Sequence, residues 1–298
     1  MSKPDWIAVD WGTSHLRAYA MSGGSVLDER MSQDGMGSLE RGQFEGALLA
    51  LVSDWLGTRT PVLACGMVGA RQGWVEAPYA NVPMAVDQVK MVNAPTLDPR
   101  LDVRVLPGVK QANPADVMRG EETQIAGFLA LNKGWDGVIC LPGTHSKWAL
   151  VSADEIVSFQ TFMTGELFAL LSEQSVLRHS LAAGGWDDTA FADALSDAMA
   201  RPEKLAAKLF SIRADNLVNG TAAEVSRPRL SGLLIGAELA AARPYWLGQQ
   251  VAVVGAPELA RLYVKALAEQ GVPATHVHGD RMTIAGLNAA RLREGISA

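Results

Sequence analysis

The stretch IAVDWGTSHLR, residues 7–17, is the starting point for interpreting the whole chain. An apolar run ends at one carboxylate, Asp10, and a turn of small polar residues follows before the chain resumes at Leu16. This order predicts a strand, a tight turn and a returning strand, with an acid and two hydroxyls at the tip. Backbone N–H groups in such a turn can bind an anion, and a neighbouring carboxylate suits Mg²⁺. An ordinary polar hairpin has the same pattern, so this stretch alone leaves both interpretations open.

A second stretch, VICLPGTHSKWALV at residues 138–151, repeats the pattern. Its Gly-Thr pair at 143–144 aligns with the pair at 12–13, and both pairs lie between apolar runs. The second copy has no acid where the first has Asp10, and Lys147 follows its turn instead. Two related hairpins, one acidic and one basic, predict two half-domains that face one polyphosphate.

Four motifs in the first half resemble the 2-dehydro-3-deoxygalactonokinase family: DWGTSHLR, GMVGARQGWVEAPY, RGEETQIAG and LPGTHSKW. VAVVGAPEL, at residues 251–259, matches the family more loosely. The resemblance implies an α/β, two-domain actin-like ATPase (ribonuclease H-like) fold, shared with heat-shock-70 and sugar kinases, with a nucleotide cleft between its domains. It assigns the first phosphate hairpin and the sugar-acid site to residues 1–134. The second hairpin and the adenosine loop fall in residues 135–298.

The same resemblance implies ATP and Mg²⁺ as cofactors. Asp10 is expected to hold the metal, directly or through water. Lys147, with His145 as a second candidate, is expected to offset charge that develops on the transferred group. The residues expected to bind the nucleotide and its phosphates are Gly12, Thr13, Ser14, Gly143, Thr144, His145, Ser146 and Gly255.

A long glycine-rich segment at residues 66–81 fits neither the Walker A spacing nor the dinucleotide-binding spacing. Long loops in compact domains are often functional, although a plain surface loop is the alternative. We interpret the segment as a wall of the sugar-acid site, in which Arg71 can bind a carboxylate through two hydrogen bonds. The substrate-binding residues predicted there are Arg71, Trp74, Glu76, Tyr79 and Asn81.

The pair Asn113-Pro114 predicts the start of a helix that runs to about Ala130, with Asn113 as its cap. Glu121 and Glu122 lie near the apolar side of this helix, so one of them is expected to face inward or into a cleft. That carboxylate is interpreted as the general base for the attacking hydroxyl. Glu122 is preferred and Glu121 stays open, while a solvated pair on the helix surface is the alternative.

The remaining pattern predicts alternating strands and helices and then an all-helical region. The predicted strands are 25–31, 61–65, 103–106, 156–162 and 251–255, and the predicted helices are 44–56, 164–177 with Thr164 as cap, 187–200, 202–213, 228–242, 256–270 and 281–293. His276 and His278 share a strand face, but no further ligand lies near them in sequence, so no metal site is predicted there.

Composition excludes several classes of protein. A formal charge of −6 over 298 residues argues against a nucleic-acid surface. No apolar run reaches the roughly 18 residues of a membrane span. No secretory leader is expected, since the first strand begins within the opening residues. Cys65 and Cys140 lie in apolar strands, which predicts two reduced thiols in a cytoplasmic protein. The macromolecular partner left open is a second copy of the chain, as a homodimer.

The predicted reaction, as the resemblance implies, is phosphoryl transfer from ATP to the carbon 6 hydroxyl of 2-dehydro-3-deoxy-D-galactonate in galactonate catabolism. Such transfer depends on positioning and charge neutralisation. Two alternatives remain. One is a phosphatase or ATP hydrolase of the same fold, against which the Arg71 loop argues. The other is a non-enzymatic sugar sensor, which would carry a DNA-binding helical module that this sequence is not expected to contain.

Overall fold

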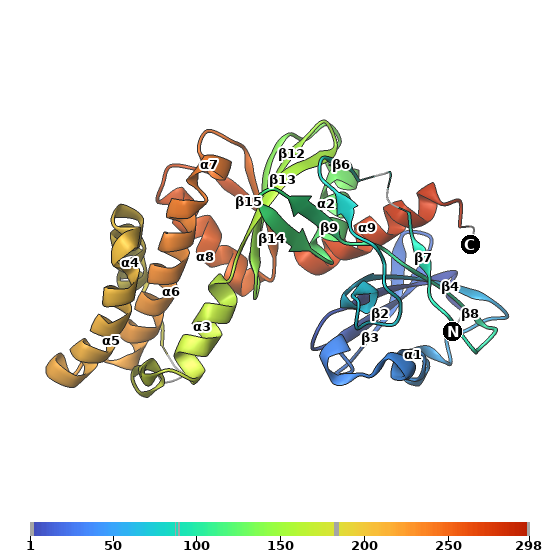
Figure 1. Cartoon of the computed structure of the whole chain (residues 1–298), viewed down its shortest axis with the longest axis horizontal. Helices are drawn as coiled ribbons and strands as arrows, with labels where there is room; N and C mark the ends of the chain where they lie inside the picture. Colours follow the sequence, from blue (N-terminus) through green and yellow to red (C-terminus); the bar gives the residue numbers. More distant parts are fainter. Residues whose placement is uncertain (1–2, 87, 89, 182–184, 297–298) are drawn as a thin grey trace. The chain divides into compact units, whose positions relative to one another are not determined.

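The computed structural model describes residues 3–86, 88, 90–181 and 185–296, which form two compact units. Figure 1 shows their helices and strands, with labels on many of them. Unit 1 comprises Met1–Asp136, Val151–Ser158 and His278–Ala298, and unit 2 comprises Gly137–Leu150 and Phe159–Val277. The predicted domain boundary at residue 134 assigns both of the later unit 1 segments to the second domain. Helix and strand patterns do not say which earlier element a returning segment packs against.

Unit 1 is built on a six-stranded sheet with the order β3-β2-β1-β4-β8-β7. Its strands are β1 (Trp6–Trp11), β2 (Leu16–Ser22), β3 (Ser25–Ser32), β4 (Thr60–Gly66), β7 (Val92–Asn93) and β8 (Leu101–Val105). The first three strands are antiparallel, and β4 lies parallel to both β1 and β8. The predicted strands at 25–31 and 61–65 and the first hairpin are therefore confirmed.

Side chains alternate along β1, so its apolar residues reach both faces of the sheet, and helices pack on each face. Ile7, Val9 and Trp11 pack with Phe44 of helix α1 (Phe44–Val52) in one apolar core. Trp6 and Ala8 face the other side, where they pack in a second core with Leu287 of helix α9 (Gly279–Arg293). Helix α9 also lies beside helix α2 (Glu121–Leu131), as Figure 1 shows. This packing explains why the C-terminal helix belongs to unit 1.

The predicted helix start at Asn113-Pro114 is wrong. Residues on either side of that pair form an antiparallel hairpin, β9 (Val109–Ala112) and β10 (Ala115–Met118), and the Asn113–Pro114 peptide bond is cis. Strand β9 also pairs with β5 (Ala80–Asn81) in a three-stranded sheet. Because β5 lies far from β9 in the sequence, the residue pattern around Pro114 does not reveal this pairing. Helix α2 begins only at Glu121, directly after Gly120 with its φ of +110°.

The sheet of unit 2 has the order β15-β14-β11-β12-β13. Its strands are β11 (Gly137–Leu141), β12 (Ser146–Ser152), β13 (Glu155–Phe162), β14 (Val251–Gly255) and β15 (Ala274–His278). The first residues of β13 belong to unit 1 and pair there with β6 (Met84–Ala85). The second predicted hairpin is thus confirmed, and its strand β11 lies parallel to β14.

The all-helical region predicted from residue 187 is present. The helices that complete the chain are α3 (Thr164–Glu173), α4 (Asp188–Ala200), α5 (Leu205–Asn219), α6 (Ala223–Ala241), α7 (Arg243–Trp246) and α8 (Pro257–Ala268). Two predicted helix starts need correction. Thr164 is the first helical residue of α3 and not its cap, which is Met163, and Pro228 lies inside α6. No helix among the described residues is long and apolar enough to cross a membrane.

Candidate functional site: two phosphate hairpins

The first hairpin closes tightly and presents its hydroxyls to solvent. The Gly12 N–H donates to the His15 carbonyl oxygen at 2.9 Å, which closes the turn between β1 and β2. The loop at residues 35–37 lies against this turn, since the Gly37 N–H donates to the Thr13 carbonyl oxygen at 2.9 Å. The side chains of Thr13 and Ser14 are exposed. The tip can therefore offer hydroxyl groups to an anion.

Asp10 lies just before this turn, among side chains of both positive and negative charge. Its Oδ2 is 3.3 Å from Nη1 of Arg17, which faces it across the β1–β2 ladder and also approaches Asp280 at 4.0 Å. Burial raises the pKa of the Asp10 carboxyl, the Arg17 guanidinium opposes this rise, and the negative charges of Asp280 and Glu121 add to it. Concentrated negative charge of this kind favours a cation.

These residues suit Mg²⁺ better than a metal that needs many protein ligands. No group of three or more His, Cys, Asp or Glu side chains is placed to hold a metal ion in the described part of the chain. Mg²⁺ usually takes only one or two carboxylates from the protein and completes its shell with water and substrate phosphates. A single carboxylate beside exposed hydroxyls fits that requirement.

Two glycines bring the start of helix α2 close to Asp10. Gly66 follows the β4 residue that pairs with Asp10, and a Cβ on it would lie 2.7 Å from the Trp11 carbonyl oxygen. Gly120 in turn lies against Gly66, because a Cβ on Gly120 would be 3.5 Å from the Gly66 Cα. Both glycines have positive φ, +90° and +110°, which side chains disfavour. Glu121 is thereby placed near enough to raise the pKa of Asp10.

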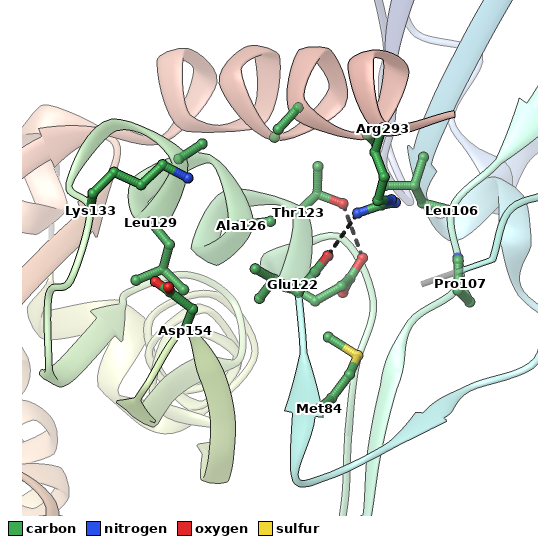
Figure 2. Close-up of a pocket in the computed structure, with 15 residues that line it drawn as sticks. Met84, Leu106, Pro107, Glu122, Thr123, Ala126, Leu129, Lys133, Asp154 and Arg293 are labelled. Atoms are coloured by element: carbon green, nitrogen blue, oxygen red, sulfur yellow. Dashed lines mark hydrogen bonds between the residues drawn. The ribbon is translucent and has the colours of Figure 1, made fainter. Parts of the chain in front are cut away.

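Glu122, the preferred base from the sequence, lies in a different environment. Its side chain is 4% exposed, and its two carboxyl oxygens accept hydrogen bonds from the Gly120 N–H at 2.9 and 2.7 Å. Burial, with the negative charge of Glu121 adding to it, raises the pKa of Glu122 to about 8. Figure 2 shows that it lines a cavity of about 360 Å³, which no residue of the first hairpin borders. The geometry thus favours Glu121 over Glu122 beside Asp10.

The second hairpin is held from one side by helix α3. Gly165 leaves no room for a side chain, since its Cβ would lie 2.2 Å from the Gly143 carbonyl oxygen. The Glu166 N–H donates to the Thr144 carbonyl oxygen at 2.9 Å, and the Glu166 carboxylate lies 2.6 Å from Nε2 of His145. The side chains of Thr144 and His145 remain exposed. The hairpin tip is therefore fixed at its backbone while its side chains face solvent.

Ser146 differs from its predicted role as a phosphate ligand. Its side chain is fully buried, and its hydroxyl lies 3.0 Å from the Tyr263 hydroxyl. Tyr263 donates to the buried Glu238 carboxylate at 2.8 Å, and the Trp148 indole N–H donates to the same carboxylate at 2.8 Å. Burial raises the pKa of Glu238, and its hydrogen bonds oppose this rise. Ser146 thus belongs to a buried polar network that fixes the start of the returning strand of the hairpin.

Lys147 is also buried, at 5% exposure, although its ammonium group returns to the hairpin tip. Its Nζ donates to the His145 carbonyl oxygen at 2.8 Å. The ammonium charge is thus held at the turn by the backbone. This placement agrees with a role in charge neutralisation.

A cavity of about 440 Å³ in unit 2 begins at this second hairpin. Gly143, Thr144 and Gly165 border it at one end, and an aromatic residue with an arginine 5.0 Å over its ring, Phe168 with Arg227, lies within it. Further lining residues that were not predicted for the site are Thr164, Trp186, Glu258 and Arg261. They come from α3, from the segment before α4 and from α8, so their grouping is visible only in space.

Gly255, the predicted adenosine-loop residue, lies beside the hairpin but does not line this cavity. A Cβ on Gly255 would be 3.4 Å from the Pro142 carbonyl oxygen. Its own carbonyl oxygen lies 3.2 Å from Nε2 of His276. Helix α8 begins two residues later and supplies the cavity-lining side chains.

The predicted sugar-acid wall divides into exposed and buried residues. Arg71, Glu76 and Asn81 are exposed. Trp74 is 5% exposed and stacks on Phe44 in the core of unit 1, with its indole N–H donating to the Pro95 carbonyl oxygen at 3.0 Å. This position does not favour its predicted role as a substrate ligand, because the ring packs in the core and the indole N–H is already bonded to Pro95.

Arg119 was missed by the sequence analysis and fixes the end of this loop. Its guanidinium lies 4.2 Å from the centre of the Tyr79 ring, and its Nη2 donates to the Ala77 carbonyl oxygen at 2.9 Å. Gly69 leaves space for the group, since a Cβ there would be 2.8 Å from Nη1 of Arg119. Tyr79 is thus half-buried under a cation, which leaves Arg71, Glu76 and Asn81 as the accessible side chains of the five.

Comparison with known proteins identifies the family of this chain. The model of the 2-keto-3-deoxy-galactonokinase family matches residues 10–290. The chain belongs to this family. A 2-dehydro-3-deoxygalactonokinase of Rhizobium meliloti (strain 1021) is 41% identical to it, over 96% of each chain. The 2-dehydro-3-deoxygalactonokinase of Escherichia coli (strain K12) is 35% identical, over 95% of this chain and 96% of that one.

Solved structures agree with this assignment. A crystal structure described as a 2-dehydro-3-deoxygalactonokinase protein from Sinorhizobium meliloti is 40% identical and has a TM-score of 0.87, covering 96% of this chain and 98% of that one. The activator of 2-hydroxyisocaproyl-CoA dehydratase from Clostridium difficile, with bound ADPNP, shares only 9% identity but has a TM-score of 0.52, over 98% and 95% of the two chains. As a member of the 2-keto-3-deoxy-galactonokinase family, the chain is a carbohydrate kinase with the actin-like ATPase fold, as predicted.

Proposed function

We propose that the chain transfers the γ-phosphoryl group of ATP to the carbon 6 hydroxyl of 2-dehydro-3-deoxy-D-galactonate, in galactonate catabolism. The observation that carries the proposal is the grouping of Asp10, Glu121 and the exposed hydroxyls of Thr13 and Ser14 at one end of the unit 1 sheet. Acid groups and anion-binding groups at one position are what phosphoryl transfer to a hydroxyl requires. The names of the relatives support the choice of sugar acid.

Nucleotide binding is assigned to the second hairpin and the cavity that begins at it. Gly143, Thr144 and His145 would hold phosphate oxygens through the backbone and exposed side chains of the turn. The adjoining 440 Å³ cavity, with its aromatic and arginine side chains, would take the nucleoside. Ser146 supports this turn from the buried network and Gly255 from the neighbouring strand end, in place of the direct contacts predicted for them.

Metal binding is assigned to Asp10. When bound, Mg²⁺ neutralises charge on the β- and γ-phosphate oxygens. Arg17 holds the Asp10 carboxyl in place and opposes the rise in its pKa that burial causes. Lys147, fixed at the second turn, would add positive charge next to the phosphates.

The role of general base moves from Glu122 to Glu121. Glu121 acts electrostatically on Asp10, whereas Glu122 is buried, hydrogen-bonded to Gly120 and directed into a separate cavity. A base must come within hydrogen-bond reach of the hydroxyl that it deprotonates. We infer that Glu121 meets this condition for a hydroxyl held between Asp10 and the Arg71 loop.

The carboxylate of the sugar acid is assigned to Arg71, whose side chain is exposed at the loop that Arg119 and Tyr79 anchor. A planar guanidinium can bind a carboxylate through two parallel hydrogen bonds. Glu76 and Asn81 would accept and donate hydrogen bonds to sugar hydroxyls from the same loop.

The proposal is tested by ADP release from ATP and Mg²⁺ with a panel of 2-keto-3-deoxy sugar acids, followed by identification of the phosphorylated carbon. We expect ADP release that depends on 2-dehydro-3-deoxy-D-galactonate and yields its 6-phosphate. Equal ADP release without any sugar acid would identify an ATP hydrolase. Faster turnover of another acid would identify a different substrate within the same class.

Two further properties remain proposals. We infer a cytoplasmic location, since Cys65 and Cys140 are free, buried thiols, as expected in a reducing compartment. We also infer a homodimer, because helix α5 exposes large apolar side chains, with Phe210 at 62%, Leu217 at 66% and Val218 at 80%. Light scattering of wild type and Phe210→Ser checks the second inference, and an unchanged monomer mass in both would reject it.

A further inference from the structure

The 360 Å³ cavity beside Glu122 is well formed and lies between two helices of unit 1. Helices α2 and α9 cross with their backbones in close approach, since a Cβ on Gly127 would lie 1.9 Å from the Met282 carbonyl oxygen. A Cβ on Gly286 would likewise lie 2.0 Å from the Thr123 carbonyl oxygen. The cavity opens next to this tight crossing. Its volume falls in the range of small-molecule sites, about 300–1,000 Å³.

The wall of the cavity is largely apolar, as Figure 2 shows. The apolar side chains that line it are Met84, Val86, Leu106, Pro107, Ala126, Leu129, Ala130, Ala289 and Ala290. A mostly apolar wall with a few polar groups is typical of sites for small organic molecules.

The polar residues inside the cavity are Thr123 and Glu122, and the carboxyl-bearing Glu122 is 4% exposed. With a pKa raised to about 8 by burial and by Glu121, it is mainly protonated at neutral pH. This carboxyl accepts from the Gly120 N–H and lies 3.2 Å from the Thr123 hydroxyl, which can donate or accept. A protonated carboxyl carries one O–H donor of its own, which can bond to the Thr123 hydroxyl or to an acceptor in the cavity.

Exposed charges border the cavity, and they are predominantly positive. Lys133 on the chain segment after α2 and Arg293 at the end of α9 provide two cations, and Asp154 provides one carboxylate. Arg293 also donates to the Val86 carbonyl oxygen at 3.0 Å, which holds its guanidinium at the border. Figure 2 shows Arg293 on the side of Glu122 and Lys133 at the other end of the cavity, so the positive charge of Lys133 favours an anionic group at that end.

We propose that this cavity binds a small organic monoanion that has an apolar body and a carbonyl oxygen at the end opposite its charge. The carbonyl oxygen accepts the proton of Glu122. The apolar body contacts Leu129 and Ala289, and the anionic group lies near Lys133, at the end of the cavity away from Glu122. A polyhydroxylated sugar acid does not fit, because its hydroxyls would lose their hydrogen bonds with water against an apolar wall.

The occupant would also act on turnover, a consequence that rests on the proposed function. Both helices that enclose the cavity present an acid from their first turn to the Asp10–Arg17 pair: Glu121 on α2 and Asp280 on α9. A molecule that contacts both helices can therefore change the position of those acids. Binding itself does not depend on the reaction, so a failure of the kinase assignment and a failure of this site are separable.

The test uses 5-oxohexanoate as the probe and the full chain as the protein. Binding is measured by isothermal titration and by saturation-transfer NMR, without ATP or sugar acid. We expect saturable binding in the millimolar range or tighter, and binding weaker by about tenfold, or about 1.4 kcal/mol, for hexanoate, which lacks the carbonyl, and for 2-hexanone, which lacks the charge. Absence of saturable binding, or equal affinity for 5-oxohexanoate and hexanoate, overturns the proposal.

Matched variants locate the bound probe. Ala289→Leu fills the cavity and is expected to weaken 5-oxohexanoate binding by about tenfold or more. Ala285→Leu changes a similarly half-buried alanine of α9 that does not line the cavity, and it is expected to leave binding unchanged. Equal binding by wild type and Ala289→Leu overturns the proposal. If Ala289→Leu does not fold, Lys133→Met decides: we expect weaker binding of 5-oxohexanoate with unchanged binding of 2-hexanone, and equal loss or no loss for both overturns it.

Discussion

At the scale of single residues, Asp10 carries the metal assignment. Its carboxyl is held by Arg17 at 3.3 Å and lies beside the first Gly-Thr turn. Asp10→Asn removes the negative charge and keeps the shape of the side chain. We expect kcat to fall by about 1,000-fold or more, the scale on which charge-stabilising groups act in phosphoryl transfer. Turnover is measured at saturating Mg²⁺, and the thermal midpoint serves as the control for folding. A near-normal kcat would remove Asp10 from the site.

The two neighbouring glutamates give an asymmetric prediction. Glu121→Gln is expected to lower kcat by about 100- to 10,000-fold, the usual contribution of a general base. Glu122→Gln should retain kcat near the wild-type value, because its carboxyl faces the separate cavity and is already mainly neutral. Steady-state kinetics of the two nearly isosteric variants compares them directly. A large loss in Glu122→Gln with normal turnover in Glu121→Gln would restore the assignment made from the sequence.

At the scale of elements, the crossing of α2 and α9 determines how these acids are placed. Gly127→Ala would put a Cβ 1.9 Å from the Met282 carbonyl oxygen, so the helices must move apart. We expect a loss of about 1–3 kcal/mol in the free energy of unfolding, as for other overpacked contacts. Gly46→Ala in α1 is the matched control, since no atom lies within 4 Å of its added Cβ. That control should gain up to about 1 kcal/mol from helix propensity. Equal changes in urea unfolding of the two variants would contradict the close crossing.

The first turn of α2 also predicts a dependence of stability on pH. The pKa of Glu122 rises from its ordinary 4.5 to about 8 in the folded chain, chiefly through burial. Between these values the folded state keeps a proton that the unfolded state releases, so stability falls as pH rises. Relative to Glu122→Gln, wild type should lose at most ~1.4 kcal/mol per pH unit in this window. Urea titrations at several pH values measure the difference. Parallel pH profiles for the two proteins would show that the carboxyl is not buried as described.

At the scale of the whole molecule, the two substrates are assigned to different units. Arg71→Lys in unit 1 should raise the KM for the sugar acid, because lysine cannot reproduce the planar guanidinium, and should leave the KM for ATP nearly unchanged. Arg227→Met in unit 2 should do the reverse, since Arg227 lines the cavity assigned to the nucleoside. Changes of about tenfold are expected for the affected substrate. If either variant changes both KM values equally, its residue has a structural role or contacts the shared phosphate.

The sequence alone determined the parts of this molecule that depend on short-range order. Both Gly-Thr hairpins, the strands that flank them and the helical region from residue 187 follow from apolar periodicity and turn residues within about ten positions. The motifs also placed the chain in its family, because they lie in those same local segments. Asp10, Thr13 and Thr144 were predicted as site residues in this way, and the structure leaves Asp10 half-buried and the two threonines exposed.

Only the tertiary structure decided which of the remaining residues are buried and which stay accessible. Trp74 and Ser146 carry polar atoms suited to binding, yet the first packs on Phe44 and the second bonds to Tyr263 inside the protein. Pairing of β9 with β5 overrode the apparent helix signal at Pro114, and Gly66 and Gly120 set which glutamate approaches Asp10. These outcomes depend on contacts between segments far apart in the chain. A local pattern specifies the character of a side chain, whereas its neighbours in space specify whether it is buried, charged or free to bind.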